Sequence, residues 1–189
     1  MEIERKFLIQ KLPDNIQQFP SHRIEQGYLC TNPVVRIRRE DDSYILTYKS
    51  QGMMSREEYN LPLTKEAYQH LCQKTDGVFI QKTRYIIPEK ENLKIELDIF
   101  HGSHQGLILA EVEFPDEQTA LAYQPPSWFS EDVTFSSQYH NSYLSQHPFS
   151  GKNTPWVLAF PDKGRIILWP FHISYVKFNP FTIQKRDTD

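Results

Sequence analysis

Charged and apolar residues alternate along short segments of this chain, beginning at its N-terminus. In the opening MEIERKF, Glu2, Glu4 and Lys6 would share one face of a β-strand, because successive side chains of a strand point to opposite faces. The opposite face would carry the apolar Ile3 and Phe7. Strands usually turn apolar residues to the core and charges to water, so this row of charges constrains what the strand can pack against.

The same alternation recurs along the chain and predicts about eight short strands. Turn signals at residues 32–33 (Asn-Pro), 41–43 (Asp-Asp-Ser) and 51–52 (Gln-Gly) favour antiparallel hairpins. No regular strand–helix–strand rhythm is present, so a parallel doubly wound sheet is not expected. The further segments with this pattern are IEQGYLC, VVRIRRE, YILTYKS, SREEYNL, KTRYII, LKIELDIF and LAEVEF.

Two helices are predicted between the strands, each preceded by a residue suited to cap its N-terminus. One begins after Thr64 and continues through EAYQHLCQK, and the other begins after Asp116 and ends before Pro125. A short third helix is predicted over SSQYHNSYL (136–144). The strands and helices together predict an α+β protein that is mainly antiparallel β.

The charges on the predicted polar faces are segregated by strand. Basic pairs are Arg36/Arg38 and Lys82/Arg84, and acidic pairs are Glu2/Glu4, Glu96/Asp98 and Glu111/Glu113. A solvated face is the simpler interpretation of any single strand, but these faces carry few Ser, Thr or Gln residues. Arginine forks bind phosphate oxygens, and carboxylates hold Mg²⁺ or Mn²⁺. The set as a whole therefore favours a site for a polyanion with divalent cations.

A barrel with its charged face inward would account for the pattern. Closure removes the edges of the sheet and would bring both sets of charges into one enclosed tunnel. The apolar face would then point outward, where helices and loops would cover it. We therefore expect the N-terminal Glu2, Glu4 and Lys6 to face an active site inside the barrel.

Composition argues against several classes of protein. The net charge is −3, so the chain lacks the general basic character of proteins that bind nucleic acid. The sequence has no apolar run of about 18 residues or more, so no membrane span is expected. Cys30 and Cys72 are the two cysteines, and with no leader before the first strand they fit a reduced, cytoplasmic protein better than a disulfide scaffold.

The ordered series of charged motifs resembles the CYTH superfamily, also called the triphosphate tunnel metalloenzymes. The Glu-x-Glu-x-Lys opening is its signature. The motifs that follow in family order are RIR at 36–38, SREEY at 55–59, KTRY at 82–85, ELD at 96–98 and EVEF at 111–114. The resemblance covers residues 1–148 and is closest to the small bacterial members that act as inorganic triphosphatases.

The resemblance implies a closed eight-stranded barrel with flanking helices, which binds a triphosphate and Mg²⁺ or Mn²⁺ in its tunnel. It also implies roles for individual residues. The implied catalytic residues are Lys6 and Tyr28. The implied substrate-binding residues are Lys6, Arg36, Arg38, Lys49, Arg56, Lys82 and Arg84. The implied metal-binding residues are Glu2, Glu4, Glu58, Glu96, Asp98, Glu111 and Glu113.

Some residues have a simpler alternative or depart from the family pattern. Packing within the wall is an equal alternative for Tyr28, and Lys94 is expected to point outward as a salt-bridge partner. Asn60 stands where close relatives often carry a glutamate. Residues 135–138 (Phe-Ser-Ser-Gln) replace an acidic and a basic residue of the relatives, in a segment expected to close one mouth of the tunnel.

The predicted domain spans residues 1–148, and residues 149–189 form a C-terminal extension to which we assign no role. The extension contains WVLAF, RIILW and FHISYVKF, which predict two or three strands with a turn at Pro-Asp-Lys-Gly. A hairpin on the barrel exterior, an interface and a poorly ordered extension are the alternatives.

The favoured function is a metal-dependent hydrolase that cleaves the terminal phosphate of inorganic tripolyphosphate, with nucleoside triphosphates as slower substrates. Adenylate cyclase, thiamine triphosphatase and a polyphosphate-binding module without turnover are the alternatives. The expected partner is a small-molecule triphosphate; neither nucleic acid nor a membrane is expected, and a homodimer stays open. Unperturbed lysine and tyrosine titrate near pH 10, so Lys6 and Tyr28 predict a rate optimum on the alkaline side.

Overall fold

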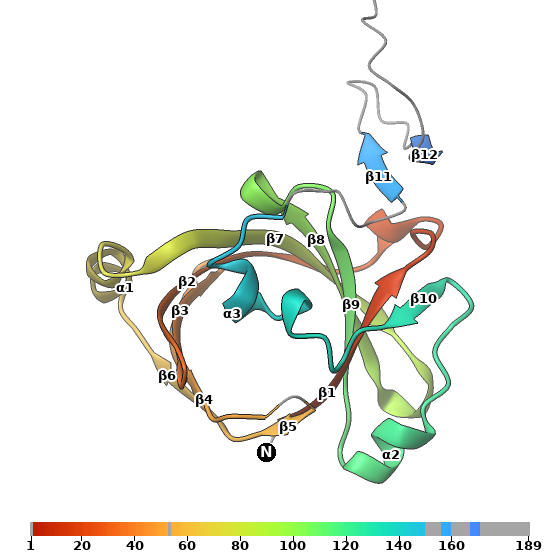
Figure 1. Cartoon of the computed structure of the whole chain (residues 1–189), viewed down its shortest axis with the longest axis horizontal. Coiled ribbons are helices and arrows are strands. Elements are labelled where there is room, and N and C mark those ends of the chain that lie inside the picture. Colours follow the sequence, from red (N-terminus) through yellow and green to blue (C-terminus); the bar gives the residue numbers. More distant parts are fainter. Residues whose placement is uncertain (1, 53, 150–155, 160–166, 171–189) are drawn as a thin grey trace, which may run out of the picture.

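Antiparallel strands account for most of the structure, as the alternating pattern predicts (Figure 1). The computed structural model describes residues 2–52, 54–149, 156–159 and 167–170. Short helices lie between the strands, which confirms the α+β class. The strands are β1 (Glu2–Ile9), β2 (Ser21–Thr31), β3 (Val34–Glu40), β4 (Ser43–Lys49), β5 (Ser55–Arg56), β6 (Glu58–Pro62), β7 (Asp76–Pro88), β8 (Lys94–His101), β9 (Ile108–Glu113), β10 (Phe129–Asp132), β11 (Trp156–Ala159) and β12 (Ile167–Pro170). The helices are α1 (Lys65–Cys72), α2 (Glu117–Ala122) and α3 (Asn141–Leu144), with 3₁₀ turns η1 (Ile16–Gln18), η2 (Lys90–Asn92), η3 (Gly102–His104) and η4 (Ser137–Tyr139).

One large antiparallel sheet curls round on itself and forms the ring seen in Figure 1. Its pairing order is β10-β1-β9-β8-β7-β2-β3-β4-β6, and the two-residue strand β5 pairs with β1. Within the described residues β6 pairs with β4 alone, so the hydrogen-bonded ladder does not close. The structure is thus a ten-stranded curled sheet instead of the continuous eight-stranded barrel that we expected, because Glu57 separates β5, paired with β1, from β6, paired with β4.

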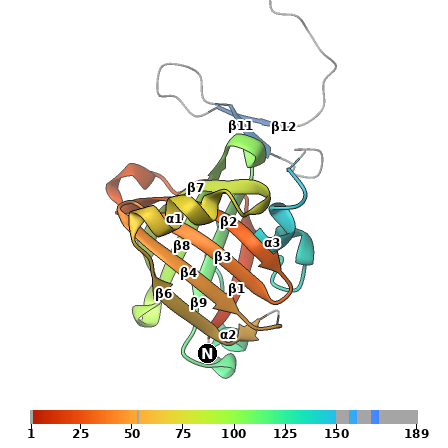
Figure 2. The same cartoon turned by 90° about the vertical axis from the view of Figure 1, so that its left-hand side faces the viewer.

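The predicted helix caps are present. Thr64 Oγ1 accepts a hydrogen bond from the backbone N–H of Ala67 at 3.2 Å, and Asp116 Oδ1 accepts one from Thr119 at 2.7 Å. Helix α1 lies on the outer surface of β3 and β4 (Figure 2). The predicted third helix is divided into η4 and α3, because the backbone of His140 between them is extended (φ −76°, ψ 136°).

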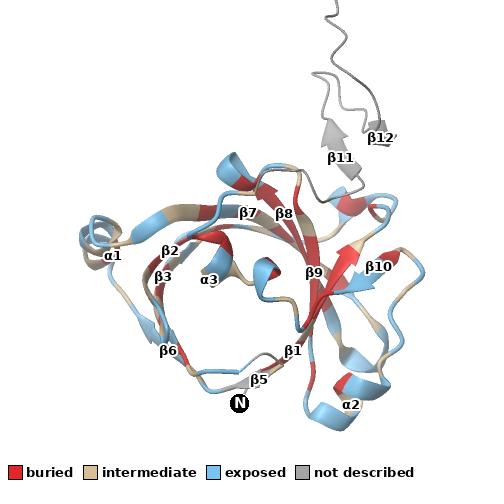
Figure 3. Cartoon of the chain, viewed as in Figure 1, coloured by how far each residue is buried: buried red, intermediate tan, exposed pale blue. Residues whose placement is uncertain are grey.

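The apolar face of the sheet points outward, as predicted, and carries the larger hydrophobic core. On β8, Ile95, Leu97 and Ile99 are buried on this face. The covering layer consists of α2, β10 and the loop after β1 (Figure 3). Because the core lies outside the ring, the opposite face of the same strands is available to carry charges.

A second apolar cluster lies on the inner face of the sheet at one end of the ring. Ile80 of β7, Phe100 of β8 and Leu109 of β9 pack there with Tyr139 and Leu144. The last two belong to residues 133–144, which we call the plug segment; η4 and α3 lie inside the ring in Figure 1. This segment closes one end of the interior, as the sequence led us to expect.

Two strands of the C-terminal extension are described. β11 and β12 pair antiparallel with each other, from Trp156↔Pro170 to Ala159↔Ile167. The third predicted run, FHISYVKF, and the Pro-Asp-Lys-Gly turn lie outside the described residues, and the domain boundary at residue 148 stays a prediction.

No helix among the described residues has the length and apolar character needed to cross a membrane. Cys30 and Cys72 are free thiols.

Leu97→Ala tests the assignment of the core to the outer face, since Leu97 is 0 % exposed. We expect this change to lower the free energy of unfolding by about 3 kcal/mol, through lost burial and the cavity left behind. Urea unfolding measures the loss. As a control, Leu61→Ala at a position that is 58 % exposed should change stability by less than about 0.5 kcal/mol. Equal losses at the two positions would contradict the assignment.

Candidate active site

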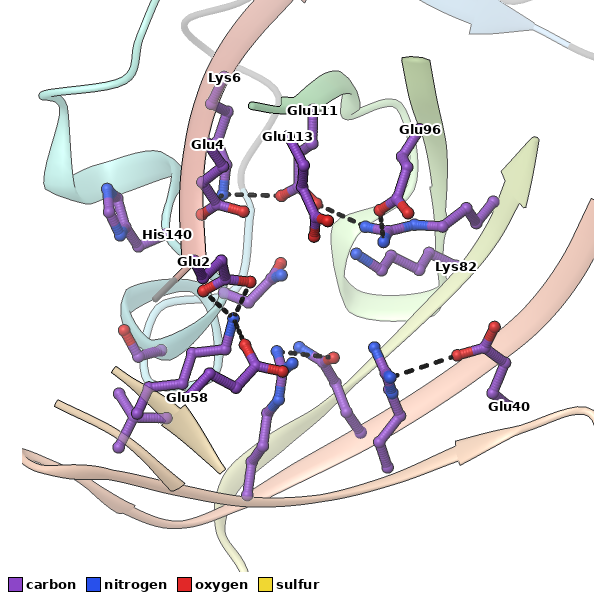
Figure 4. Close-up of a pocket in the computed structure, with 18 of the residues that line it drawn as sticks. Glu2, Glu4, Lys6, Glu40, Glu58, Lys82, Glu96, Glu111, Glu113 and His140 are labelled. Atoms are coloured by element: carbon purple, nitrogen blue, oxygen red, sulfur yellow. Dashed lines mark hydrogen bonds and ion pairs between the residues drawn. The ribbon is translucent and has the colours of Figure 1, made fainter. Parts of the chain in front are cut away.

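A polar cavity of about 360 Å³ lies inside the ring (Figure 4). Strands β1 to β4 and β6 to β9 supply its walls, and the plug segment contributes one further side. Alternation turns the charged face of each strand inward, so most of the predicted site residues meet here. Those that line the cavity are Glu2, Glu4, Lys6, Tyr28, Arg36, Arg38, Lys49, Glu58, Lys82, Arg84, Glu96, Glu111 and Glu113.

Strands β1 and β9 form the acidic wall of the cavity. Their register pairs Glu4 with Glu113 and Lys6 with Glu111. Lys6 Nζ lies 2.7 Å from Glu111 Oε1 and 4.0 Å from Glu4 Oε1. The backbone N–H of Lys6 donates to Thr134 Oγ1 at 3.0 Å, so the plug segment helps to fix where this lysine stands.

Arg84 of β7 is shared between three carboxylates. Its Nη2 lies 2.6 Å from Asp98 Oδ2 and 2.5 Å from Glu111 Oε2, and its Nη1 is paired with Glu96. Lys82 forms a further buried ion pair with Asp98. Asp98 is fully buried and does not line the cavity. Its position therefore does not fit the expected metal role; the carboxylate anchors Lys82 and Arg84 instead.

Lys49 joins β4 to the N-terminal strand and to β6. Its Nζ lies 2.6 Å from both carboxylate oxygens of Glu2 and 2.5 Å from Glu58 Oε2. Asn60 Nδ2 donates to Glu58 Oε1 at 2.7 Å, and Thr47 Oγ1 donates to Asn60 Oδ1 at 2.7 Å. The asparagine that stands in place of a family glutamate thus orients Glu58 without adding a charge.

Two arginines of β3 keep donor groups available on the wall formed by β2 and β3. The Nε atoms of Arg36 and Arg38 are buried and have no hydrogen-bond partner among the described residues. Arg36 Nη1 donates to Gln26 Oε1 at 3.4 Å, and Arg38 Nη2 lies 3.5 Å from Glu40 Oε2. Burial, followed by the charge of Arg36, lowers the pKa of Arg38. A bound anion would satisfy these donors and remove the repulsion between the two guanidinium groups.

The carboxylates of the acidic wall repel one another. Burial, followed by the charges of Glu2, Glu4 and Glu111, raises the pKa of Glu113. Burial and the charge of Glu4 likewise raise the pKa of Glu2. This donor set fits a divalent cation, because the ion would offset both burial and repulsion. In the rotamers present, the described residues hold no group of three or more Asp, Glu, His or Cys side chains arranged to ligate a metal, so these side chains would have to turn toward the ion.

Ion pairs have the opposite effect on two other carboxylates. Burial alone would raise the pKa of Glu111, but three nearby cations, Lys6 foremost, hold it well below its usual range. For Glu58, the charge of Lys49 and hydrogen bonds outweigh burial and lower the pKa to about 2. Both carboxylates are therefore ionised partners of lysines, whereas Glu113 is the carboxylate with an unrelieved electrostatic cost.

Sequence reasoning missed several residues that line the cavity: His22, Gln26, Val34, Glu40, Ile86, His140, Asn141 and Ser142. Gln26 and Glu40 were expected on the inner face, because Gln26 alternates with Tyr28 and Glu40 with Arg38, but neither was given a role in the site. No local pattern marks residues 140–142, which reach the cavity because the plug segment folds back into the ring. Within the described chain, residues 135–138 contribute nothing to the lining, and Phe135 is 69 % exposed.

The expectation for Lys94 was wrong. Lys94 lines the cavity instead of pointing outward, because it alternates with Glu96 on β8 and so shares the inner face.

Arg56 lies on β5 opposite Glu2 in the register. Its side chain is outside the part of the chain that the structure describes, so its substrate role stays a prediction.

A curled antiparallel sheet that encloses carboxylates opposite a pair of arginines defines a tunnel-like site for a polyanion. The chain belongs to the CYTH domain family, whose model matches residues 1–143. The family predicted from the ordered motifs is thereby confirmed.

Similar proteins include two inorganic triphosphatases. One, from Nitrosomonas europaea, is 38 % identical over 147 residues, which are 76 % of this chain and 96 % of the relative. The other, from Acetivibrio thermocellus, is 33 % identical over 156 residues, which are 78 % of this chain and 95 % of the relative. The chain is also similar to the crystal structure of the inorganic triphosphatase NE1496, with 36 % sequence identity and a TM-score of 0.59. The match covers 77 % of this chain and 94 % of the chain in the crystal structure.

Glu111→Gln tests the buried ion pairs of the acidic wall. The depressed pKa of Glu111 means that its ionised form stabilises the fold above the unfolded pKa near 4.5, and that this contribution is lost as pH falls. We expect the substitution to cost about 3 kcal/mol of unfolding free energy at pH 7, since Lys6 and Arg84 lose a buried partner. The cost should be smaller at pH 4. Urea unfolding of both proteins at the two pH values measures it, and a cost that is larger at pH 4 would contradict the assignment.

Proposed function

We propose that this chain is a metal-dependent hydrolase that cleaves the terminal phosphate of inorganic tripolyphosphate, with slower action on nucleoside triphosphates. The observation that carries the proposal is the buried, unpartnered Nε of Arg36 and of Arg38, which share one cavity with the acidic wall. A polyanion accompanied by divalent cations would neutralise both walls at once. The similarity to two inorganic triphosphatases favours tripolyphosphate over the substrates of other enzymes with this fold.

The basic side chains would hold the substrate. Phosphoryl transfer depends mainly on positioning and on stabilising charge, which fits a cavity lined by cations. Arg36 and Arg38 offer guanidinium donors for phosphate oxygens, and Lys82 and Arg84 add positive charge from β7. Asp98 holds Lys82 and Arg84 from behind, so neither side chain has to reorganise when the substrate arrives.

The acidic wall would hold Mg²⁺ or Mn²⁺. Glu2, Glu4 and Glu113 are the residues whose mutual repulsion a cation would relieve. When bound, such an ion polarises phosphate oxygens and lowers the pKa of a coordinated water. Glu58, Glu96 and Glu111 are engaged with Lys49, Arg84 and Lys6 and would contribute mainly by holding these cations in place.

Lys6 and Tyr28 would accept or hold the proton of the attacking water. Lys6 Nζ is buried beside Glu111, and Tyr28 lies at the boundary between the polar lining and the apolar cluster of the plug segment. Gln26 Nε2 donates to Tyr28 Oη at 3.1 Å and so orients the phenol group. Both side chains are therefore buried and positioned by neighbours, as general acid–base groups require.

The proposal also includes the closure of the tunnel, the partner and the location of the protein. The curled sheet acts as a closed tunnel, an inference that the pairing of β5 with β1 at Glu2↔Arg56 supports. The partner is a small-molecule triphosphate, supported by the size and polarity of the cavity. The location is cytoplasmic, supported by the two free thiols.

Phosphate release tests the function. Tripolyphosphate, ATP and thiamine triphosphate are compared with Mg²⁺, Mn²⁺ or EDTA, and tripolyphosphate is expected to be hydrolysed fastest, with metal only. Glu4→Gln and Arg38→Ala should each lower the rate by about 100-fold, because each removes charge from a wall of the site. Arg39→Ala, on the outer face of the same strand, is the matched control and should leave the rate unchanged. Tight binding of tripolyphosphate without any release would show a binding module instead.

Tyr28→Phe separates a catalytic role of Tyr28 from simple packing. We expect the wild-type rate to be higher at pH 9 than at pH 6, and kcat of the variant to fall by about 100-fold, the usual contribution of a positioned proton-transfer group. The ring is retained, so thermal unfolding should show a folded protein. A variant within about threefold of the wild type at both pH values would show that Tyr28 only packs in the wall.

A further inference from the structure

Strand β3 carries a row of side chains along the cavity whose charge changes sign. Val34, Arg36, Arg38 and Glu40 all line the cavity, and alternate residues of a strand are spaced by about 7 Å. The row is thus apolar, then twice positive, then negative. Val34 packs against the apolar cluster that includes the plug segment, so Glu40 stands at the far end of the row. Figure 4 shows His140 of the plug segment and Glu40 on opposite sides of the cavity.

The end of the cavity near the plug segment has no room for a longer ligand. Tyr139 and Leu144 fill the interior there together with Ile80, Phe100 and Leu109, all of which are buried. Along β3, a phosphate chain held by Arg36 and Arg38 can therefore be extended past Arg38, toward Glu40, but not past Arg36.

Glu40 is placed to meet such an extension. Its carboxylate lies 3.5 Å from Arg38 Nη2, and its side chain is 29 % exposed. Asp41 and Asp42 follow it in the turn to β4 and add negative charge outside the cavity; Asp41 Oδ2 lies 2.8 Å from Nδ1 of His22, which also lines this end. At this end of the row on β3, the negative charge therefore comes from Glu40 and is reinforced by the turn.

Lys94 is a cation of the lining that stands on another strand. It precedes Ile95, which pairs with Val112, so the register brings Lys94 alongside Glu113 of the acidic wall. Lys94 therefore stands beside the acidic wall, whereas Glu40 lies directly in line with the two arginines that would hold the phosphates.

We propose that Glu40 limits the length of the phosphate chain that this cavity accepts, by repelling a fourth phosphate placed beyond Arg38. The inference rests on the proposed function, since it assumes that Arg36 and Arg38 bind the triphosphate. Two like charges about 4 Å apart in an aqueous setting weaken binding by about fivefold, and by more in a partly dry cavity. A triphosphate with a neutral group beyond its last phosphate does not meet this penalty.

Isothermal titration calorimetry in EDTA, where no metal-dependent turnover can occur, tests the inference. Dissociation constants are measured for tripolyphosphate and tetrapolyphosphate with the wild type, Glu40→Gln and the matched control Asp42→Asn, which neutralises a neighbouring charge outside the cavity. We expect the wild type to bind tripolyphosphate at least about fivefold more tightly than tetrapolyphosphate. Glu40→Gln should bring this ratio close to one, and Asp42→Asn should retain it. The wild-type ratio should also fall as salt screens the repulsion.

The outcomes separate this inference from the proposed function. A ratio that is unchanged in Glu40→Gln, including the case in which both ligands gain affinity equally, would overturn the role of Glu40. A ratio that falls equally in Asp42→Asn would overturn it as well, because the effect would then be one of general surface charge. Absence of tripolyphosphate hydrolysis by the wild type with Mg²⁺ or Mn²⁺ would overturn the proposed function. The ratio of the two dissociation constants in EDTA would still test the role of Glu40.

Discussion

One buried guanidinium group, that of Arg84, connects neighbouring strands of the inner wall through ion pairs. It is shared by Asp98 and Glu96 of β8 and by Glu111 of β9, and Glu111 in turn pairs with Lys6 of β1. Charges inside a protein are costly unless each has a well-placed partner. The network meets this condition across four neighbouring strands, so the charged interior and the curvature of the sheet depend on each other.

The position of the hydrophobic core makes this interior feasible. In an ordinary closed barrel of this size, inward-facing side chains are apolar and fill the centre. Here the larger core lies outside the ring, between the sheet and a layer made of α2, β10 and the loop after β1. Apolar residues occupy the interior only near the plug segment, where Phe100 and Leu109 meet Leu144. The result is a cavity that is polar along most of its length and closed at one end.

The pairing of charges inside the ring is incomplete in a way that points to a ligand. Lys6, Lys49 and Arg84 have carboxylate partners, whereas the Nε atoms of Arg36 and Arg38 have none among the described residues. The acidic wall likewise contains carboxylates whose pKa values are raised by burial and by one another. A polyanion with divalent cations supplies both missing charges. This complementarity explains why the site would recognise phosphate groups in preference to an uncharged substrate.

The amino-acid sequence by itself determined which side chains face inward, because strand periodicity is strictly two. It was enough to place Glu2, Glu4, Lys6, Arg36 and Arg38 in one site and to identify the family. Periodicity says nothing about depth along the tunnel or about what covers its ends. Only the tertiary structure showed that one predicted ligand is a buried anchor, which residues of the plug segment reach the cavity, and that the sheet ends without a continuous ladder. Each of these features depends on strand register and on long-range packing, which no local pattern encodes.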